Sequence, residues 1–395
     1  MEQTKTKKLY DIDAYATEFE AKVLSCEEVA DSNLCEGKET IYVVVLDQTL
    51  FFPEEGGQTP DKGNIDEAEV VDVQIKGDVI RHYVTKWLQP NGCVRGEIDW
   101  SHRFSNMQQH SAEHIFSGLA YKKYGYSNVG FHLSNQIVTM DFNGVFTEEQ
   151  IQEMEWEVNA AIVANAEVKT GYPDKAVLEG LEYRSKLALT ENIRIVEIDG
   201  YDICACCAPH VHRTGEIGMF KIQSVQNYKG GMRISFLAGF RALEEYRRKT
   251  EIISELSGIL TTNQDNLADH VTKLKAQVYN LKSQLSSAKQ AMMQKKIDEI
   301  PASQQDVILF EQDLEAADMR SVVNKLMEAH EGICGVFVGD DVEGYNFIIG
   351  SKTANCCDVA NKLRTELNAR GGGKPQMIQG SVAAKADIIQ GVLTS

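Results

Sequence analysis

The sequence predicts an α+β protein with four successive parts. Short β-branched runs with glycine and proline between them fill the first hundred residues, helical segments lie among further strands, and an unbroken heptad pattern follows. We expect a β-barrel-like subdomain over residues 1–98 and an α+β layer over 99–245. A long helix or coiled-coil linker is expected over 246–300, and a small α/β domain over 301–395.

Strand and turn signals predict the structure of the first part, residues 1–98. Ile41–Leu46 (IYVVVL) is a β-branched run, and FFPEEGGQTPDKGN after it is rich in turn-forming residues. Further alternation appears in AEVVDVQI and DVIRHYV. Several short strands with such punctuation favour a small barrel.

The second part mixes helices and strands. MQQHSAEHIFSGLAYKKYG predicts a helix that ends at Gly125, and HLSNQIVTMDF predicts a strand. TEEQIQEMEWEVNAAIVANA predicts a second helix with Thr147 as its N-cap.

The third part carries an a/d seam, which predicts a long helix that pairs with another helix or packs within this chain. After Pro301, the pattern strand, helix, strand, strand, helix and a glycine-rich loop predicts a small α/β sandwich. The seam residues follow one another at alternating steps of four and three: Leu267, Val271, Leu274, Val278, Leu281, Leu285, Ala288 and Met292.

Composition narrows the class of protein. A net charge of -18 argues against binding nucleic acid over the whole surface, although local basic clusters remain compatible with it. Nine cysteines in 395 residues are too sparse for a disulfide scaffold. The N-terminus does not resemble a signal peptide and no long apolar run predicts a membrane span, so we expect a cytoplasmic protein.

Two pairs of residues predict a metal site. His110 and His114 lie four apart on one predicted helix, so both imidazoles share a face, and Cys206 and His210 form a second pair with the same spacing. A thiolate with three imidazoles suits Zn²⁺. Ser111 stands where a zinc protease has its glutamate, and Glu113 is expected to point away from the ligand face.

Several segments, in order, resemble the editing domain of alanyl-tRNA synthetases and its free-standing relatives, the long AlaX proteins. These are LDQTLFFPEEGGQTPDKG, IDWSHRFSNMQQHSAEHIFSG, CCAPHVHRTGEIGMFKI and GMRISFLAGFRALEEY. NARGGGKPQMIQGS resembles the signature of the C-terminal domain of those synthetases. The chain departs from the family pattern at two places. Glu55 stands where the family has a glycine, and Cys207, Ala208 and Pro209 stand where the family has Gly-Gly-Thr.

The resemblance implies hydrolysis of the ester in tRNA for alanine that carries serine or glycine, with zinc as cofactor. It implies that Thr49 and Gln58 line the editing pocket, and that Arg370, Gly371, Gly372, Gly373 and Lys374 bind tRNA. Separately from the resemblance, the heptad seam is compatible with a homodimer through the long helix, and the C-terminal domain is an alternative place for that contact. ATP use and aminoacylation are not expected, because there is no room for an aminoacylation domain before this region and the GGGKP segment lacks the Ser or Thr of a P-loop.

Two other functions compete with this one. A non-catalytic tRNA-binding protein would hold the same zinc in a structural role, since four protein ligands close a tetrahedral site. A metal-dependent phosphoesterase would need an Asp-His-His type motif, which the sequence lacks. The general base, and the metal ligand that gives way to water or substrate, stay open at this point.

Overall fold

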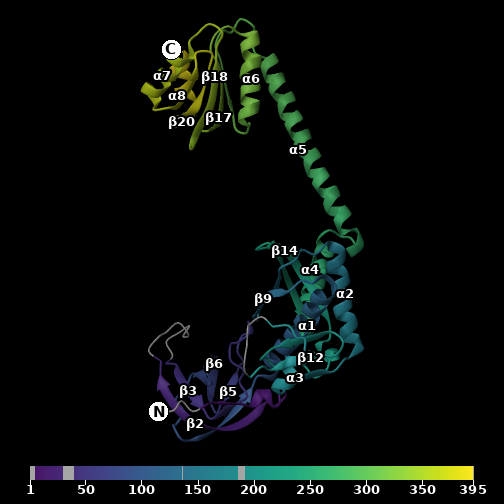
Figure 1. The fold of residues 1–395 in the computed structure, drawn as a ribbon. Coiled ribbons are helices and arrows are strands. Elements are labelled where there is room, and N and C mark those ends of the chain that lie inside the picture. The colour runs from purple at the N-terminus through teal and green to yellow at the C-terminus, as the bar shows by residue number, and fades with distance from the viewer. Residues whose placement is uncertain (1–4, 30–39, 136, 186–191, 395) are drawn as a thin grey trace. The chain divides into compact units, whose positions relative to one another are not determined.

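The structure is a computed structural model that describes residues 5–29, 40–135, 137–185 and 192–394. The chain divides into two compact units, Met1–Glu255 and Leu256–Ser395, and each is described by itself (Figure 1). Both combine helices with mainly antiparallel sheets, which confirms the α+β class. The boundary falls within helix α4, Gly239–Ile259.

The N-terminal strands of the first unit pair in a closed ring, in the order β2-β3-β7-β6-β5-β8. In β2, Phe19, Ala21 and Val23 are buried and the residues between them are exposed, as the two-residue period of a strand requires. The inward residues form one hydrophobic core. The strands are β2 (Glu18–Glu28), β3 (Tyr42–Leu46), β5 (Gly63–Ile65), β6 (Ala68–Lys76), β7 (Val79–Val84) and β8 (Cys93–Ile98), with a short parallel pair of β1 (Lys7–Lys8) and β4 (Gln48–Thr49).

The loop after β4 packs against the second layer of this unit. Gly57 has φ 84°, and a Cβ on it would lie 2.2 Å from the carbonyl oxygen of Phe131, so only glycine permits the approach. The amide of Leu133 donates to the carbonyl of Gly57 at 2.7 Å. The neighbouring Gln58 is therefore held against strand β9, Asn128–Leu133.

Helix α1, Trp100–Tyr124, lies inside the first unit, with helix α2 beside it (Figure 1). Asp99 caps its first turn by accepting from the amide of His102, and Gly125 ends it in the left-handed conformation, as the sequence predicted. Of its 25 residues, 15 are buried, and nine of those 15 are polar or charged. A helix with so polar a buried face requires partners for its side chains.

Two sheets surround α1, with strand orders β14-β15-β10-β9 and β11-β12-β13. Thr147 caps α2, because its hydroxyl accepts from the Gln150 amide while the Gln150 side chain accepts from the Thr147 amide. The remaining elements are β10 (Val138–Phe142), α2 (Glu148–Ala164), β11 (Val168–Gly171), α3 (Lys175–Gly180), β12 (Ile195–Ile198), β13 (Asp202–Ala205), β14 (Phe220–Tyr228) and β15 (Gly231–Ala238).

The second unit begins with the end of α4 and the long helix α5, Leu267–Asp298, and continues into a five-stranded sheet. Met293 and Ile297 at the end of α5 pack with α6 on one face of that sheet, while α7 and α8 cover the other face. Its strand order is β16-β17-β18-β20-β19. The elements are β16 (Val307–Glu311), α6 (Ala316–Ala329), β17 (Cys334–Asp340), β18 (Gly344–Gly350), α7 (Cys356–Leu367), β19 (Arg370–Lys374), β20 (Met377–Val382) and α8 (Ala386–Thr394).

The expectation of a glycine-rich loop is wrong at residues 370–374, which form the edge strand β19 paired with β20. Its glycines allow close pairing, because a Cβ on Gly371 would lie 2.3 Å from the carbonyl oxygen of Gln379. A Cβ on Gly373 would lie 2.4 Å from the carbonyl oxygen of Met377. Among the described residues, no helix has the length and apolar character needed to cross a bilayer.

Candidate metal centre

The structure brings together the side chains of His110, His114, Cys206 and His210. The two histidines of α1 share one face of the helix, and Cys206 and His210 follow strand β13. The ligand atoms of all four residues lie within 4.8 Å of one another. The three histidines are buried and Cys206 is half-buried, so the cluster is shielded on most sides.

The distances suit a tetrahedral metal ion. The Cys206 Sγ lies 3.6 Å from the His110 Nε2 and 3.4 Å from the His210 Nε2. In a tetrahedral zinc site, the usual Zn–N and Zn–S bond lengths place nitrogen and sulfur about 3.5 Å apart. One thiolate and three imidazoles therefore form a donor set of the right size and chemistry for zinc.

A second layer of side chains orients each imidazole. The Nδ1 atom of His110 lies 2.8 Å from the Gln58 Oε1, and that of His210 lies 3.0 Å from the Ser111 Oγ. Because Nδ1 is engaged in this way, Nε2 is the nitrogen of each ring that is directed toward Cys206. Outer partners of this kind fix the orientation of metal-binding histidines.

His114 has the strongest of these outer partners. Its Nδ1 lies 2.9 Å from the Oδ2 of Asp202, and Arg184 donates to both oxygens of Asp202 at 2.7 Å. Asp202 is buried, and the side chain of Arg184 is 14% exposed. Burial raises the pKa of Asp202, but the hydrogen bonds from Arg184 and His114 outweigh it and hold that pKa below its usual value.

The protonation states in the cluster follow from its buried charges. Burial raises the pKa of Cys206, but the charge of His110 and hydrogen bonds from three imidazoles bring it well below its usual value. Burial lowers the pKa of His210 to about 3. Burial would also lower the pKa of His114, but Asp202 and Cys206 raise it to about 10. A thiolate is thus favoured at Cys206, and the thiolate is the form that binds metals.

Thr49 and Gln58, which the resemblance assigns to one pocket, have different hydrogen-bond partners in the structure. Gln58 is fully buried and contacts His110, while its Nε2 has no hydrogen-bond partner in the described part of the chain. The hydroxyl of Thr49 lies 2.9 Å from the His82 Nε2 inside the barrel and accepts from the amide of Phe51. Gln58 therefore joins the cluster, and Thr49 has its hydrogen bonds within the barrel.

The other predicted site residues lie in the second unit. Arg370, the three glycines and Lys374 are all exposed along the edge strand β19. Hydrogen bonds join this strand to β20 on one side, and no other strand of the described sheet pairs with it. The segment presents exposed backbone and two cations together.

The sequence reasoning missed three residues beside the cluster: Asp202, Arg184 and Glu113. The expectation that Glu113 points away from the ligand face is wrong, since its Oε2 lies 4.0 Å from the His114 Nε2. Glu113 is three residues after His110, and this spacing returns a side chain to the same helical face. The spacing His-x-x-Glu-His was the available signal.

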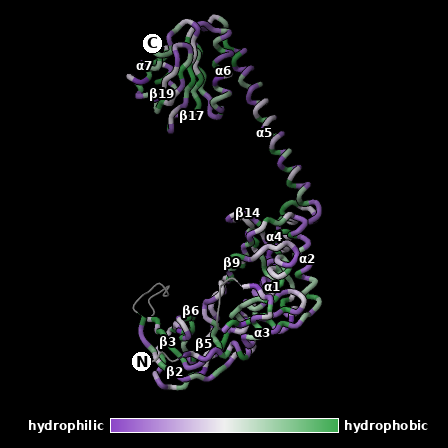
Figure 2. Tube along the Cα trace, viewed as in Figure 1, coloured by the Kyte–Doolittle hydropathy of each residue, from purple (hydrophilic) through white to green (hydrophobic). Residues whose placement is uncertain are grey.

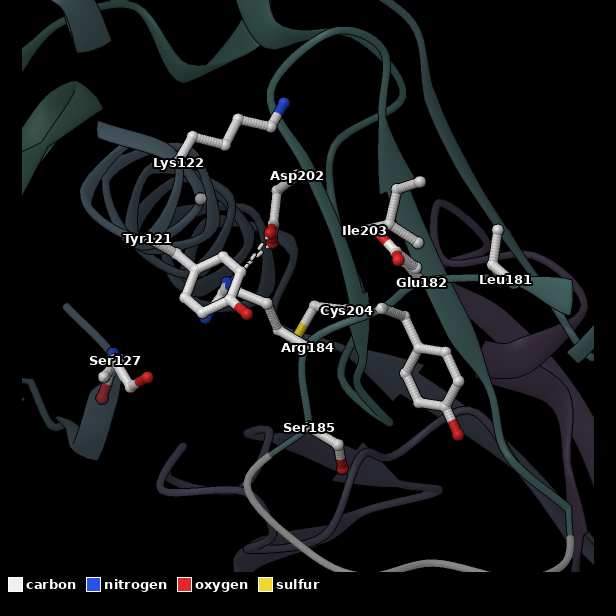
Figure 3. Close-up of a pocket in the computed structure, with 13 residues that line it drawn as sticks. Tyr121, Lys122, Ser127, Leu181, Glu182, Arg184, Ser185, Asp202, Ile203 and Cys204 are labelled. Carbon is white, nitrogen blue, oxygen red and sulfur yellow. Dashed lines mark hydrogen bonds and ion pairs between the residues drawn. The ribbon is translucent and has the colours of Figure 1, made fainter. Parts of the chain in front are cut away.

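A pocket of about 730 Å³ lies next to this outer layer (Figure 3). Figure 3 shows Arg184 and Asp202 joined by hydrogen bonds in its wall, with Tyr121 and Lys122 near them. Strand β13, helix α1, strand β9 and residues 181–185 contribute its lining. Its volume is typical of a small-molecule binding site.

Comparison with known proteins identifies the relatives of this chain. Residues 193–235 match the threonyl and alanyl tRNA synthetase second additional domain, and residues 1–102 match class II (A) tRNA synthetases. An alanyl-tRNA editing protein Aarsd1 of Danio rerio is 28% identical over 393 residues, which cover 95% of this chain and 94% of that protein. The chain is thus similar, over nearly its whole length, to free-standing alanyl-tRNA editing proteins.

The same chain also aligns with larger enzymes. The alanine–tRNA ligase of Methanoregula boonei is 30% identical over 399 residues, and that of Ignicoccus hospitalis is 28% identical over 382. These alignments cover 95% and 93% of this chain, but only 41% and 40% of the ligases. The chain thus spans about two fifths of their length.

Proposed function

We propose that this chain is a zinc-dependent deacylase that hydrolyses serine, and also glycine, from mischarged tRNA for alanine. The observation that carries the proposal is the convergence of three imidazole Nε2 atoms on one thiol, with the amide of Gln58 attached to the same cluster. The similarity to alanyl-tRNA editing proteins over nearly the whole chain supports the substrate class.

His110, His114, Cys206 and His210 would hold the zinc, which supplies polarisation of the ester carbonyl when it is bound. Four ligands close a tetrahedral site, so water or substrate must approach where one of them is accessible. Cys206 is the half-buried member of the four, while the three histidines are buried. We therefore place the approach of the ester on the Cys206 side.

Gln58 would select the substrate. Its buried Nε2 lacks a partner among the described residues, so a hydroxyl or carbonyl oxygen of the substrate would satisfy it. Serine carries a hydroxyl that alanine lacks, and a buried amide left unpaired by alanine would disfavour the correctly charged tRNA. Thr49 would act indirectly, by supporting the barrel next to the site, because its hydroxyl pairs with His82.

The second unit would supply binding to tRNA and to a second copy of the chain. Arg370 and Lys374 flank exposed glycines, where phosphates have access to both cations and backbone amides. The seam of α5 presents apolar side chains at heptad spacing, which suits a homodimer through that helix.

The decisive experiment is a deacylation assay with seryl-, glycyl- and alanyl-tRNA for alanine, combined with metal analysis of the purified protein. We expect loss of the seryl ester, slower loss of the glycyl ester, a stable alanyl ester and about one zinc per chain. A protein that contains zinc and binds tRNA but leaves all three esters intact would instead be the non-catalytic tRNA-binding protein. The closed set of four ligands is the observation that keeps this second function in view.

A further inference from the structure

Glu113 lies beside the metal-binding cluster without belonging to it. We propose that Glu113 orients the hydrolytic water and accepts its proton, an inference that rests on the deacylase function proposed above. The residue stands in the sequence His110-Ser-Ala-Glu113-His114, so both histidines and the glutamate share one face of α1.

The position of the carboxylate is the first support. Glu113 is 2% exposed, and its Oε2 lies 4.0 Å from the His114 Nε2. This nitrogen is the one directed toward Cys206, because Asp202 engages the other ring nitrogen. The carboxylate therefore borders the inner side of the cluster.

The second support is the way in which the carboxylate is held. The hydroxyl of Ser117 donates to the Glu113 Oε1 at 2.6 Å, and the side-chain amide of Asn128 donates to the same oxygen. Asn128 also donates to the Ser117 hydroxyl at 3.1 Å, so the two donors are fixed relative to each other. Two donors on Oε1 orient the carboxylate with Oε2 on the side of His114.

The third support is the position of a neighbouring pocket. Asn128, which donates to Glu113, lines the pocket of Figure 3, and so does Asp202, which holds His114. One layer of side chains thus separates this pocket from the pair formed by Glu113 and His114. The pocket of about 730 Å³ therefore borders the residues that hold Glu113 and His114 in place.

The chemistry balances with water as the only co-substrate. The water oxygen forms a bond to the ester carbonyl carbon while one of its protons passes to the Glu113 carboxylate. The bond between this carbon and the ribose oxygen then breaks, and the ribose oxygen takes up the proton from Glu113. The products are the free amino acid and uncharged tRNA, and Glu113 returns to its starting state.

Glu113→Gln is the sharpest test, because glutamine keeps an Oε1 acceptor for Ser117 and Asn128 while removing the basic oxygen. We expect the zinc content per chain and the KM for seryl-tRNA to stay unchanged, and kcat to fall by about 10²- to 10⁴-fold. Glu113→Asp should recover part of the lost kcat. Glu155→Gln is a matched control, since Glu155 is a half-buried helical glutamate that bonds to the Ile222 amide, and it should retain full activity.

The outcomes separate this inference from the function on which it rests. If the unaltered protein cleaves seryl-tRNA and Glu113→Gln does so equally well with its zinc in place, the role of Glu113 is refuted. A Glu113→Gln protein that loses its zinc also refutes it, because Glu113 would then support the metal rather than the water. Should Glu113→Gln fail to fold, Ser117→Ala should keep zinc and lower kcat several-fold, and an unchanged kcat would overturn the inference. An inactive unaltered protein would instead defeat the deacylase function itself.

Discussion

Helices α1 and α5 are both long, but they differ in which side chains they bury and which they expose. Helix α1 buries 15 of its 25 residues, nine of them polar or charged, while α5 buries only Met293 and Ile297 of its 32. Along α5, apolar residues recur between polar ones (Figure 2), and its seam residues Val271, Leu274 and Leu281 are exposed. Buried polar groups need partners and define a site, whereas exposed apolar groups at regular spacing define an interface.

The largest loss of zinc and of activity is expected from a substitution at the centre of α1. His114→Ala removes one imidazole and leaves the Asp202 carboxylate without this partner, so we expect loss of zinc and a fall of deacylase activity by at least roughly 10³-fold. Metal analysis and single-turnover deacylation measure the two effects. His212→Ala is the control, because His212 stacks on Tyr15 outside the cluster and should keep both zinc and activity. Full activity of His114→Ala without zinc would refute the proposed role of the metal.

His82 inside the barrel is a buried polar residue outside α1, and it tests whether such a residue also depends on its hydrogen-bond partners. Burial lowers the pKa of His82 to about 4, and its Nδ1 donates to the Val44 carbonyl while its Nε2 accepts from Thr49. The unfolded chain protonates this histidine near its ordinary pKa of about 6.5, before the folded protein does. Stability from His82 is therefore complete above pH 6.5 and is lost as the pH falls toward 4, by up to roughly 3 kcal/mol.

His82→Gln should make the free energy of unfolding depend less on pH between 6.5 and 4. Denaturant titrations at several pH values measure this by tryptophan fluorescence, because Trp87, Trp100 and Trp156 all lie in the first unit. His270→Gln on α5 serves as the control and should leave the pH dependence unchanged. An equally steep loss of stability in both variants would show that His82 is not its source.

A smaller loss of zinc affinity is expected from a substitution of Asp202, the outer partner of His114. Asp202→Asn keeps the size of the side chain but weakens its bonds with both Arg184 and the His114 ring, so the ring loses its fixed orientation. Loss of such a partner typically weakens metal affinity by about 10- to 100-fold. Competition with a chelator measures the affinity, with Asp199→Asn as the control at an exposed position on the same β-hairpin. Unchanged zinc affinity would show that Asp202 does not position His114.

The sequence predicted what depends on local spacing. The two histidines on one face, the Gly125 terminus and the Thr147 cap each follow from helix geometry over a few residues. Asp202 and Arg184 could not be found in this way, because Asp202 reaches His114 from a strand far along the chain and Arg184 contacts only Asp202 in this network. The glycines at 371–373 predict a loop, but their lack of side chains also permits the close pairing that the structure has in β19.

The smallest effect on stability, and the clearest on assembly, is expected in α5. Leu281→Glu places a charge in the exposed seam, so it should change the free energy of unfolding of one chain by no more than about 0.5 kcal/mol. The proposed homodimer would lose a core position, and sedimentation should then show one chain where the unaltered protein shows two. Gln284→Glu adds the same charge outside the seam and should leave the dimer intact. If the unaltered protein is already a single chain in solution, the seam is not a homodimer interface, and its exposed apolar side chains require a different partner helix.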